Sequence, residues 1–118
     1  MPNKSVRIGG ASGYWGESAM ATPQLLGAGV DYLVYDYLAE ITMSIMARAH
    51  AKDPAMGFAG DFISAVLKSH ARTIATQGVK VIANAGGVNP AACGDAARAL
   101  LKEQGLDLKV AVITGDNL

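Results

Sequence analysis

Short runs of β-branched and aliphatic residues alternate along the chain with longer stretches in which apolar residues return at helical spacing. The short runs predict four strands, at Val6–Gly9, Tyr32–Tyr35, Val79–Ala83 and Lys109–Ile113. Strands that alternate with helices favour parallel pairing through right-handed crossovers. The sequence therefore predicts an α/β fold, with a mostly parallel sheet of about four strands and helices on both faces.

The first and last predicted helices both contain proline near an end. The first spans about Glu17–Leu26 and contains Pro23, so it is either short or begins late, with Thr22 as its cap. The last begins at Asn89-Pro90, where a capping side chain precedes proline, and it ends at Gln104-Gly105.

Two successive helices are predicted between the second and third strands. The earlier one runs from Leu38 to Ala51, and its apolar positions share one helical face: Leu38, Ile41, Ile45 and Ala49, joined by Met46. Asp53-Pro54 ends this helix. Asp61 then caps a helix that ends near Gln77-Gly78 and directs these residues toward the core: Phe62, Val66, Leu67, His70 and Ile74.

Length and composition suit one compact domain that needs further protein around it. Hydrophobic residues make up 51% of the 118 positions and charged residues only 17%, which predicts apolar surface that more protein covers. The chain also stops at residues 115–118, directly after a predicted strand, where an α/β protein normally enters its next helix. We therefore expect residues 1–118 to form a single α/β domain, or the N-terminal segment of a longer one. We expect it to form a homo-oligomer or to associate with the remainder of a longer protein.

Charge, hydrophobic stretches and cysteine content argue against nucleic acid or membrane as partners and against secretion. Lys plus Arg equals Asp plus Glu at 10 each, so no basic stripe is available to neutralise nucleic-acid phosphates. No stretch approaches the roughly 20 apolar residues of a membrane-spanning helix, and the amino end lacks the apolar core of a signal peptide. Cys93 is the only cysteine, which excludes an intrachain disulfide. We expect a cytoplasmic protein that binds neither nucleic acid nor membrane.

Polar and glycine residues gather directly after each predicted strand, in residues 9–16, 36–40, 84–89 and 115–117. The carboxyl ends of parallel strands meet at one edge, where open α/β sheets bind ligands and helix amino ends favour a phosphate or carboxylate. We therefore predict a small-molecule site with an anion-binding loop at 84–89. The candidate ligand-binding residues are Gly10, Ser12, Gly13, Asn84, Gly86, Gly87 and Asn89. The alternative for each loop is that its glycines only make tight turns.

Three carboxylates and one thiol are the candidate catalytic groups. Asp36, Glu40 and Asp116 are expected near the same edge, where they suit acid and base roles or a divalent cation. Alternatively, Asp36 caps the following helix and Glu40 completes the capping arrangement. Cys93 lies in the first turns of its helix, where the dipole lowers the pKa of an exposed thiol, and a small buried side chain is the alternative. We name no metal site, because the two histidines lack ligand spacing, and the cofactor is unknown.

Common enzyme motifs fail on inspection. The glycines at 10, 13 and 16 form neither G-x-G-x-x-G nor the G-x-x-x-G-x-G of short-chain dehydrogenases, and no tyrosine is followed four residues later by lysine. Tyr14 stands where the serine-hydrolase motif G-x-S-x-G requires glycine. Neither a short-chain dehydrogenase nor a serine hydrolase is indicated.

Four segments together resemble the acyclic terpene utilisation family in order and spacing over nearly the whole chain: GASGYWG at 10–16, DYLVYDYLAEITM at 31–43, NAGGVNP at 84–90 and TGD at 114–116. Members of that family are several times longer, often with a ferredoxin-like carboxyl-terminal domain, and are associated with breakdown of citronellol- and geraniol-type compounds through acyl-CoA intermediates. The resemblance implies the N-terminal part of a protein that acts on or binds a branched acyl-CoA or carboxylate intermediate. A non-catalytic anion-binding or assembly module is the alternative. The resemblance assigns no catalytic role to any residue.

Overall fold

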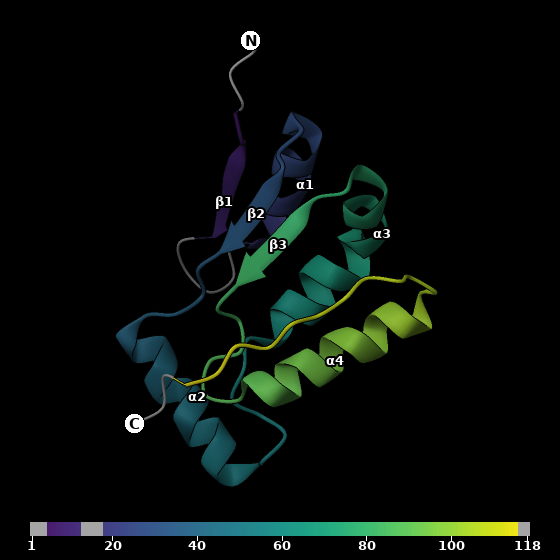
Figure 1. Ribbon diagram of the computed structural model, residues 1–118. Coiled ribbons are helices and arrows are strands. Elements are labelled where there is room, and N and C mark those ends of the chain that lie inside the picture. Colours follow the sequence, from purple (N-terminus) through teal and green to yellow (C-terminus); the bar gives the residue numbers. More distant parts are fainter. Residues whose placement is uncertain (1–4, 13–17, 116–118) are drawn as a thin grey trace.

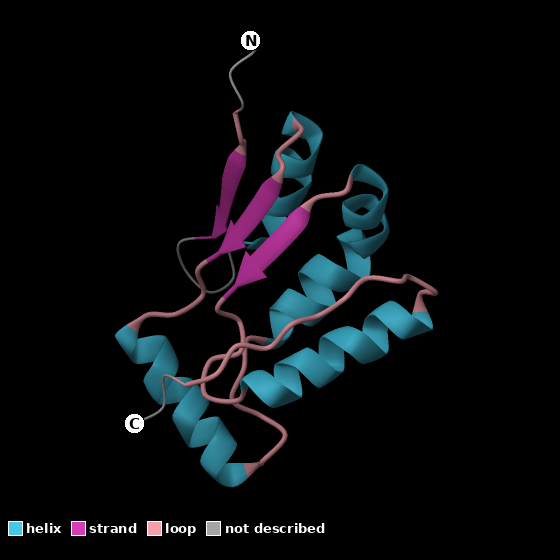
Figure 2. Ribbon diagram, viewed as in Figure 1, coloured by secondary structure: helices cyan, strands magenta, loops and turns pink. Residues whose placement is uncertain are grey.

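The computed structural model describes residues 5–12 and 18–115. Helices and strands alternate along the chain, except between the second and third strands (Figures 1 and 2). There one helix is followed, after a linker, by a π-helical turn that continues directly into a second helix. In chain order the elements are β1 (Ile8–Ser12), α1 (Ser18–Ala28), β2 (Tyr32–Tyr35), α2 (Glu40–Lys52), the π-helical turn η1 (Phe62–Leu67), α3 (Lys68–Gln77), β3 (Lys80–Ala83) and α4 (Pro90–Glu103).

The described strands form one parallel sheet in the order β1-β2-β3. Ile8 of β1 is the register partner of Tyr32 in β2, and Tyr32 is in turn the partner of Lys80 in β3. The register of β1 on β2 shifts between Gly10 and Ser12. The parallel pairing confirms the predicted α/β fold, and β2 has the bounds that the sequence predicted.

The predicted strand at 109–113 is wrong, because this segment has no partner in the sheet, which has three strands among the described residues instead of four. Residues 106–113 run back along α4 (Figure 1), with alternate residues half-buried and exposed. Arg98 of α4 donates from Nη2 to the carbonyl oxygen of Val110 at 2.9 Å, and Val112 fills the space that a Cβ at Gly94 would need. The alternation of apolar and polar residues that predicted a strand therefore arises because one side of this extended segment packs against α4.

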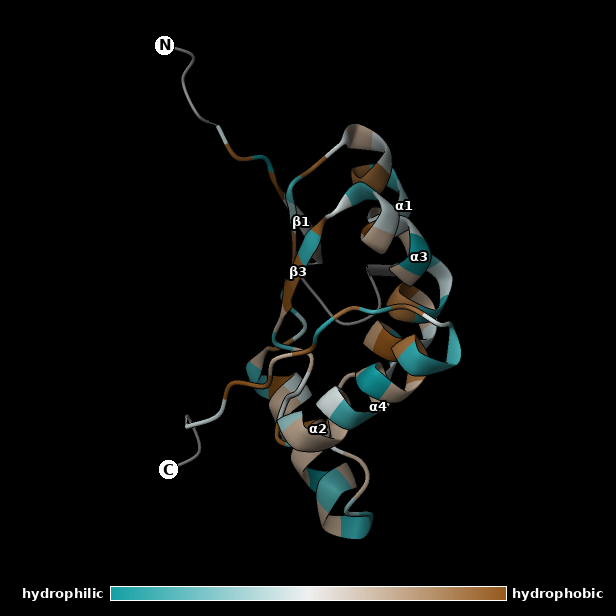
Figure 3. Ribbon diagram, turned by 45° about the vertical axis from the view of Figure 1, so that its right-hand side comes forward, coloured by the Kyte–Doolittle hydropathy of each residue, from teal (hydrophilic) through white to brown (hydrophobic). Residues whose placement is uncertain are grey.

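The helices α1, α3 and α4 lie on one side of the sheet (Figure 3), whereas the sequence predicted helices on both faces. The strand order explains the difference, because the chain moves across the sheet in one direction, from β1 to β2 to β3. Right-handed crossovers in one direction place all of their helices on the same face of the sheet. Helices reach the second face only where the strand order reverses. Among the described residues, that second face presents Ile8 and Ile82, which are 66% and 57% exposed.

Several helix ends lie where turn and cap residues predicted them, although Asp61 is itself helical in conformation and its side chain does not cap η1. Gly78 ends α3 in the left-handed conformation, at φ 69°, and Asn89 begins α4 by accepting the N–H of Ala92 through Oδ1 at 3.3 Å. The first helix differs, because Pro23 lies inside α1 and does not begin it. Of the described helices, none is both long enough and apolar enough to pass through a bilayer.

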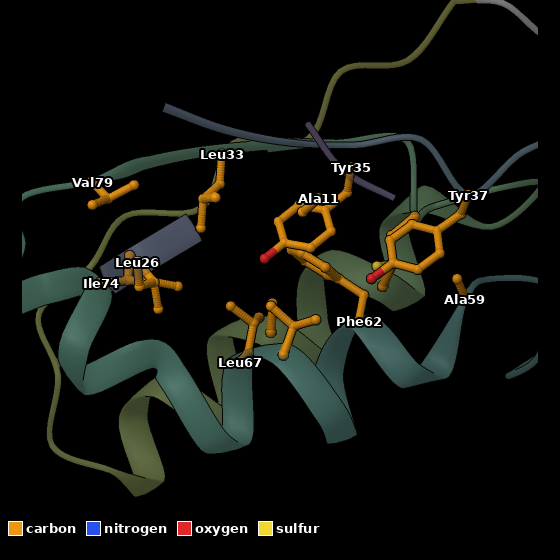
Figure 4. Close-up of a cluster of buried hydrophobic side chains, with 14 of the residues drawn as sticks. Ala11, Leu26, Leu33, Tyr35, Tyr37, Ala59, Phe62, Leu67, Ile74 and Val79 are labelled. Carbon is orange, nitrogen blue, oxygen red and sulfur yellow. The ribbon is translucent and has the colours of Figure 1, made fainter. Parts of the chain in front are cut away.

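An aromatic cluster occupies the core between the sheet and η1 (Figure 4). Tyr35 stacks on Tyr37 with 5.9 Å between ring centroids, and Phe62 meets both rings edge-on at 5.4 and 6.1 Å. The buried hydroxyls of Tyr35 and Thr22 are hydrogen-bonded at 2.8 Å. Burial raises the pKa of Tyr35, and the smaller effect of the Thr22 hydrogen bond lowers it. Thr22 thus satisfies a core hydroxyl instead of capping a helix.

Only part of the predicted apolar face of α2 packs against the rest of the protein. Met46 and Thr42 are the buried residues of this helix, whereas Ile41 is 72% exposed and Ile45 is 49% exposed. The helix extends away from α1, α3 and α4 (Figure 1), and the sulfur of Met46 lies against Gly87. Its position in the fold, and not its apolar periodicity, decides which side of α2 is covered.

Candidate functional site

A polar side chain follows β2 and another follows β3 at the same edge of the sheet. Asp36 follows β2 and Asn84 follows β3, and Asn84 Nδ2 donates a hydrogen bond to Asp36 Oδ1 at 2.7 Å. The Oδ1 atom of Asn84 accepts the backbone N–H of Tyr37 at 2.7 Å. The structure thus joins two residues that the sequence proposed from separate loops. We call the side chains of Asp36 and Asn84, with the Tyr37 amide, the strand-end cluster.

The strand-end cluster is anchored in the core on one side and exposed on the other. Tyr37 is buried in the aromatic cluster, whereas Asp36 and Asn84 are exposed. The amide of Asn84 is bonded through its oxygen to the backbone after β2 and through its nitrogen to Asp36. This arrangement holds a carboxylate, which accepts protons, beside an amide, which donates hydrogen bonds.

Glu40 is the first residue of α2, and its side chain is exposed. The N-cap residue of α2 is Ala39, and no side-chain hydrogen bond caps this described helix. The alternative in which Asp36 and Glu40 form a capping arrangement is therefore wrong. Asp36 belongs to the strand-end cluster instead.

The loop after β3 is packed closely at both of its central glycines. A Cβ at Gly86 would lie 2.8 Å from Pro90. A Cβ at Gly87 would meet the sulfur of Met46 and would lie 2.6 Å from the carbonyl oxygen of Gly57. Gly87 also has a φ of 55°, in the left-handed region that favours glycine. The two glycines therefore have a packing reason of their own, and anion binding at this loop stays a prediction.

Asn89 connects this loop to the segment that follows α2. Its Oδ1 caps α4, while its Nδ2 donates to the carbonyl oxygens of Pro54 and Met56, both at 2.9 Å. Nδ1 of His50 also lies 3.0 Å from the Met56 carbonyl oxygen. The side chain of Asn89 thus makes contacts within the protein, and its role toward a ligand stays a prediction.

The remaining ligand-binding candidates lie around β1. Gly10 and Ser12 belong to this strand instead of a loop. Gly10 is exposed, and no atom lies within 4 Å of the position that a Cβ would take there. Ser12 pairs with Tyr35 at the end of β2, which places its backbone at the same edge as the strand-end cluster. The candidates Gly13 and Asp116 lie outside the described residues.

Cys93 of α4 is buried in the hydrophobic core. Burial raises the pKa of its thiol from 9.0 to about 11, which is the opposite of the lowering that activates a thiol at a helix amino end. These surroundings match the alternative of a small buried side chain. Across residues 5–12 and 18–115, no group of three or more His, Cys, Asp or Glu side chains is placed to hold a metal ion.

An apolar hollow between α2 and residues 55–61 was not predicted from the sequence. Its volume is about 420 Å³. The side chains that define it are Ile45, Met46, Ala49, Met56 and Phe58, with Asp61 as the charged one. The linker after α2 already contained a signal, because Met56 and Phe58 are large apolar residues in a stretch otherwise rich in glycine and turn residues. We call this feature the α2 hollow.

Comparison with known proteins concerns almost the whole chain. The family described as acyclic terpene utilisation family protein AtuA matches residues 6–118. The chain matches no curated protein and no solved structure. The matched range contains both the strand-end cluster and the α2 hollow.

Proposed function

The chain belongs to the acyclic terpene utilisation family, and from this premise we propose that its strand-end edge binds the carboxylate or thioester group of a branched acyl intermediate. The intermediate, free or attached to coenzyme A, is of the kind formed in the breakdown of citronellol- and geraniol-type compounds. One observation carries the proposal: the hydrogen bond by which Asn84 holds the Asp36 carboxylate at the carboxyl edge of a parallel sheet.

Position and chemistry both support this edge. Ligands of open α/β sheets bind outside the carboxyl ends of the strands. The loop at 84–89 leads directly into α4, whose amino end favours a negatively charged oxygen. If the thioester carbonyl oxygen of a bound ligand accepts a hydrogen bond at this edge, the C–H group next to that carbonyl becomes more acidic. Asp36 is then the adjacent group that accepts the proton. The same arrangement serves binding alone or acid–base chemistry on the bound acyl group.

The test is a titration of the ¹⁵N-labelled chain with isovaleryl-CoA, coenzyme A and isovalerate, followed by backbone amide shifts. We expect isovaleryl-CoA to shift the amides of Tyr37 and of residues 84–87. Asn84→Ala should weaken binding roughly tenfold or more, as expected for loss of a hydrogen bond to a charged or developing-charge group. The matched control is Gln24→Ala, which removes an exposed side-chain amide from α1 and should leave the affinity unchanged.

Two results would overturn the proposal. One is that none of the three compounds moves the amides of residues 36–37 and 84–87. The other is that Asn84→Ala, shown by circular dichroism to be folded, binds isovaleryl-CoA as tightly as the wild type.

Turnover distinguishes an enzyme from a binding module. If the chain exchanges the protons next to the thioester carbonyl in D₂O, Asp36→Asn should abolish the exchange and preserve binding. The exposed Asp107→Asn serves as the control for charge removal. Binding without turnover of any acyl-CoA would identify the non-catalytic module.

A further inference from the structure

The α2 hollow is joined to the strand-end edge through one loop. The segment on its outer side is hydrogen-bonded to the loop after β3, with Ala59 N–H donating to the carbonyl oxygen of Ala85 at 2.7 Å and Val88 N–H donating to that of Gly57 at 3.0 Å. That loop begins at Asn84, a member of the strand-end cluster. The strand-end edge and the outer side of the hollow are therefore built on the same loop.

The outer side of the hollow is held in place by specific contacts. The carbonyl oxygen of Met56 receives the hydrogen bond of Asn89 Nδ2 at 2.9 Å and lies 3.0 Å from His50 Nδ1. Gly57 follows with a φ of 111°, and a Cβ there would lie 2.9 Å from Val88. The segment can approach the loop this closely only with glycine at position 57. The hollow is thus built by the fold and is pre-formed, as most small-molecule sites are.

The chemistry of the lining favours a hydrocarbon chain. Aliphatic groups, thioethers and one aromatic ring form its surface, and Ile45 and Met56 remain about half exposed beside it. Covering such surface with an apolar group is favourable, and flexible methionine side chains adapt to branched shapes. Asp61 is the charged side chain of the lining, which among the described residues contains no cationic side chain that could pair with an anionic group of a ligand. The volume of about 420 Å³ lies within the usual range for small-molecule pockets, about 300–1,000 Å³.

We infer that the α2 hollow binds the branched hydrocarbon chain of the ligand, while the carboxylate or thioester group of that ligand lies outside it at the strand-end cluster. The assignment of the polar group rests on the proposed function. The assignment of the hydrocarbon chain rests on the hollow itself. Ile45 and Met56, which are about half exposed, are then specificity-determining residues that select ligands by the length and branching of the chain.

The experiment titrates butanoate, octanoate and 3,7-dimethyloctanoate, below their micelle concentrations, into the full chain labelled with ¹³C at the methionine methyl groups. We expect octanoate and dimethyloctanoate to shift the methyl signals of Met46 and Met56. Affinity should rise about fourfold for each added methylene until the hollow is full, because this is the factor that corresponds to the free energy of moving a methylene group out of water. Equal affinity for butanoate and octanoate would overturn the inference.

Two matched variants of α2 test the location. Ala49→Phe places a ring in the hollow and should abolish the dependence of affinity on chain length. Ala47→Phe places the same ring at an exposed position about 200° around the helix and should leave the dependence unchanged. If Ala49→Phe binds dimethyloctanoate like the wild type, the hollow is not the site.

Failures of the two proposals give different results. If the proposed function fails, no acyl-CoA shifts the amides of residues 84–87, while long carboxylates still shift Met46 and Met56. If this inference fails, isovaleryl-CoA shifts residues 84–87 while the methionine methyl signals stay in place for every ligand. A second copy of the chain is the other possible occupant of the hollow, and sedimentation velocity measures self-association without ligand. If the chain self-associates and the methyl signal of Met56 shifts with protein concentration, the hollow is an interface between copies and the inference is overturned.

Discussion

Replacing Gly87 with alanine measures how tightly α2 and the loop after β3 are packed. At φ 55° an alanine incurs a left-handed penalty of about 1–2 kcal/mol, of which the stiffer unfolded chain returns about 0.4–1 kcal/mol. The new methyl group would also meet the Met46 sulfur and the Gly57 carbonyl oxygen, and overpacking costs about 1–3 kcal/mol. We therefore expect the free energy of unfolding to fall by about 2–4 kcal/mol.

Gly78→Ala is the matched control, because Gly78 has a φ of 69° and no atom lies within 4 Å of the position of its Cβ. It should incur only the backbone part, about 1 kcal/mol or less. Urea unfolding followed by far-ultraviolet circular dichroism measures both variants, provided that the dependence on urea is unchanged. Losses that agree within about 0.5 kcal/mol would refute close packing at Gly87.

A double-mutant cycle identifies the contact. In a Met46→Ala background the sulfur is gone, so Gly87→Ala should destabilise less than it does in the wild type, although the Gly57 carbonyl oxygen remains. The loss caused by Gly78→Ala should be the same in both backgrounds. Additive losses for Gly87→Ala and Met46→Ala would show that the two residues do not interact.

Three further outcomes are expected. Thr22→Val should cost about 1–3 kcal/mol in urea unfolding, because the buried Tyr35 hydroxyl loses its Thr22 partner, and an equal loss in a Tyr35→Phe background would contradict this reason. Stability should fall as pH rises from 9 towards 11, because the unfolded Cys93 thiol, with a pKa of 9.0, loses its proton while the folded thiol, with a pKa of about 11, retains it. Cys93→Ala should flatten this part of the profile, and an unchanged profile would count against burial as its cause. The protein should self-associate through the uncovered sheet face, so Ile8→Ser should lower the mass found by light scattering, whereas a wild-type monomer at every concentration would disprove the idea.

Local preferences were enough to locate the elements whose signals act over a few residues. A run of β-branched and aromatic residues set the bounds of β2, Gly78 ended α3, and Asn89 with proline after it began α4. The alternation of strands and helices was enough for parallel pairing and for placing Asp36 and Asn84 at one edge. Each of these signals depends on the conformation of a short segment, which the neighbouring side chains already restrict.

The chain by itself therefore determined most of its elements, its parallel pairing and the edge at which polar residues gather, whereas the tertiary structure alone decided which surfaces meet. The alternation in 106–113 suits a strand or an extended segment on a helix, and Arg98 and Gly94 of α4 select the second. Part of the apolar face of α2 stays open, because the helix packs through Thr42 and Met46 and leaves Ile45 to line the α2 hollow. A pattern along the sequence states which residues share a face, but it does not state what that face contacts, because the partner lies far away in the chain and packing against it is chosen only on folding.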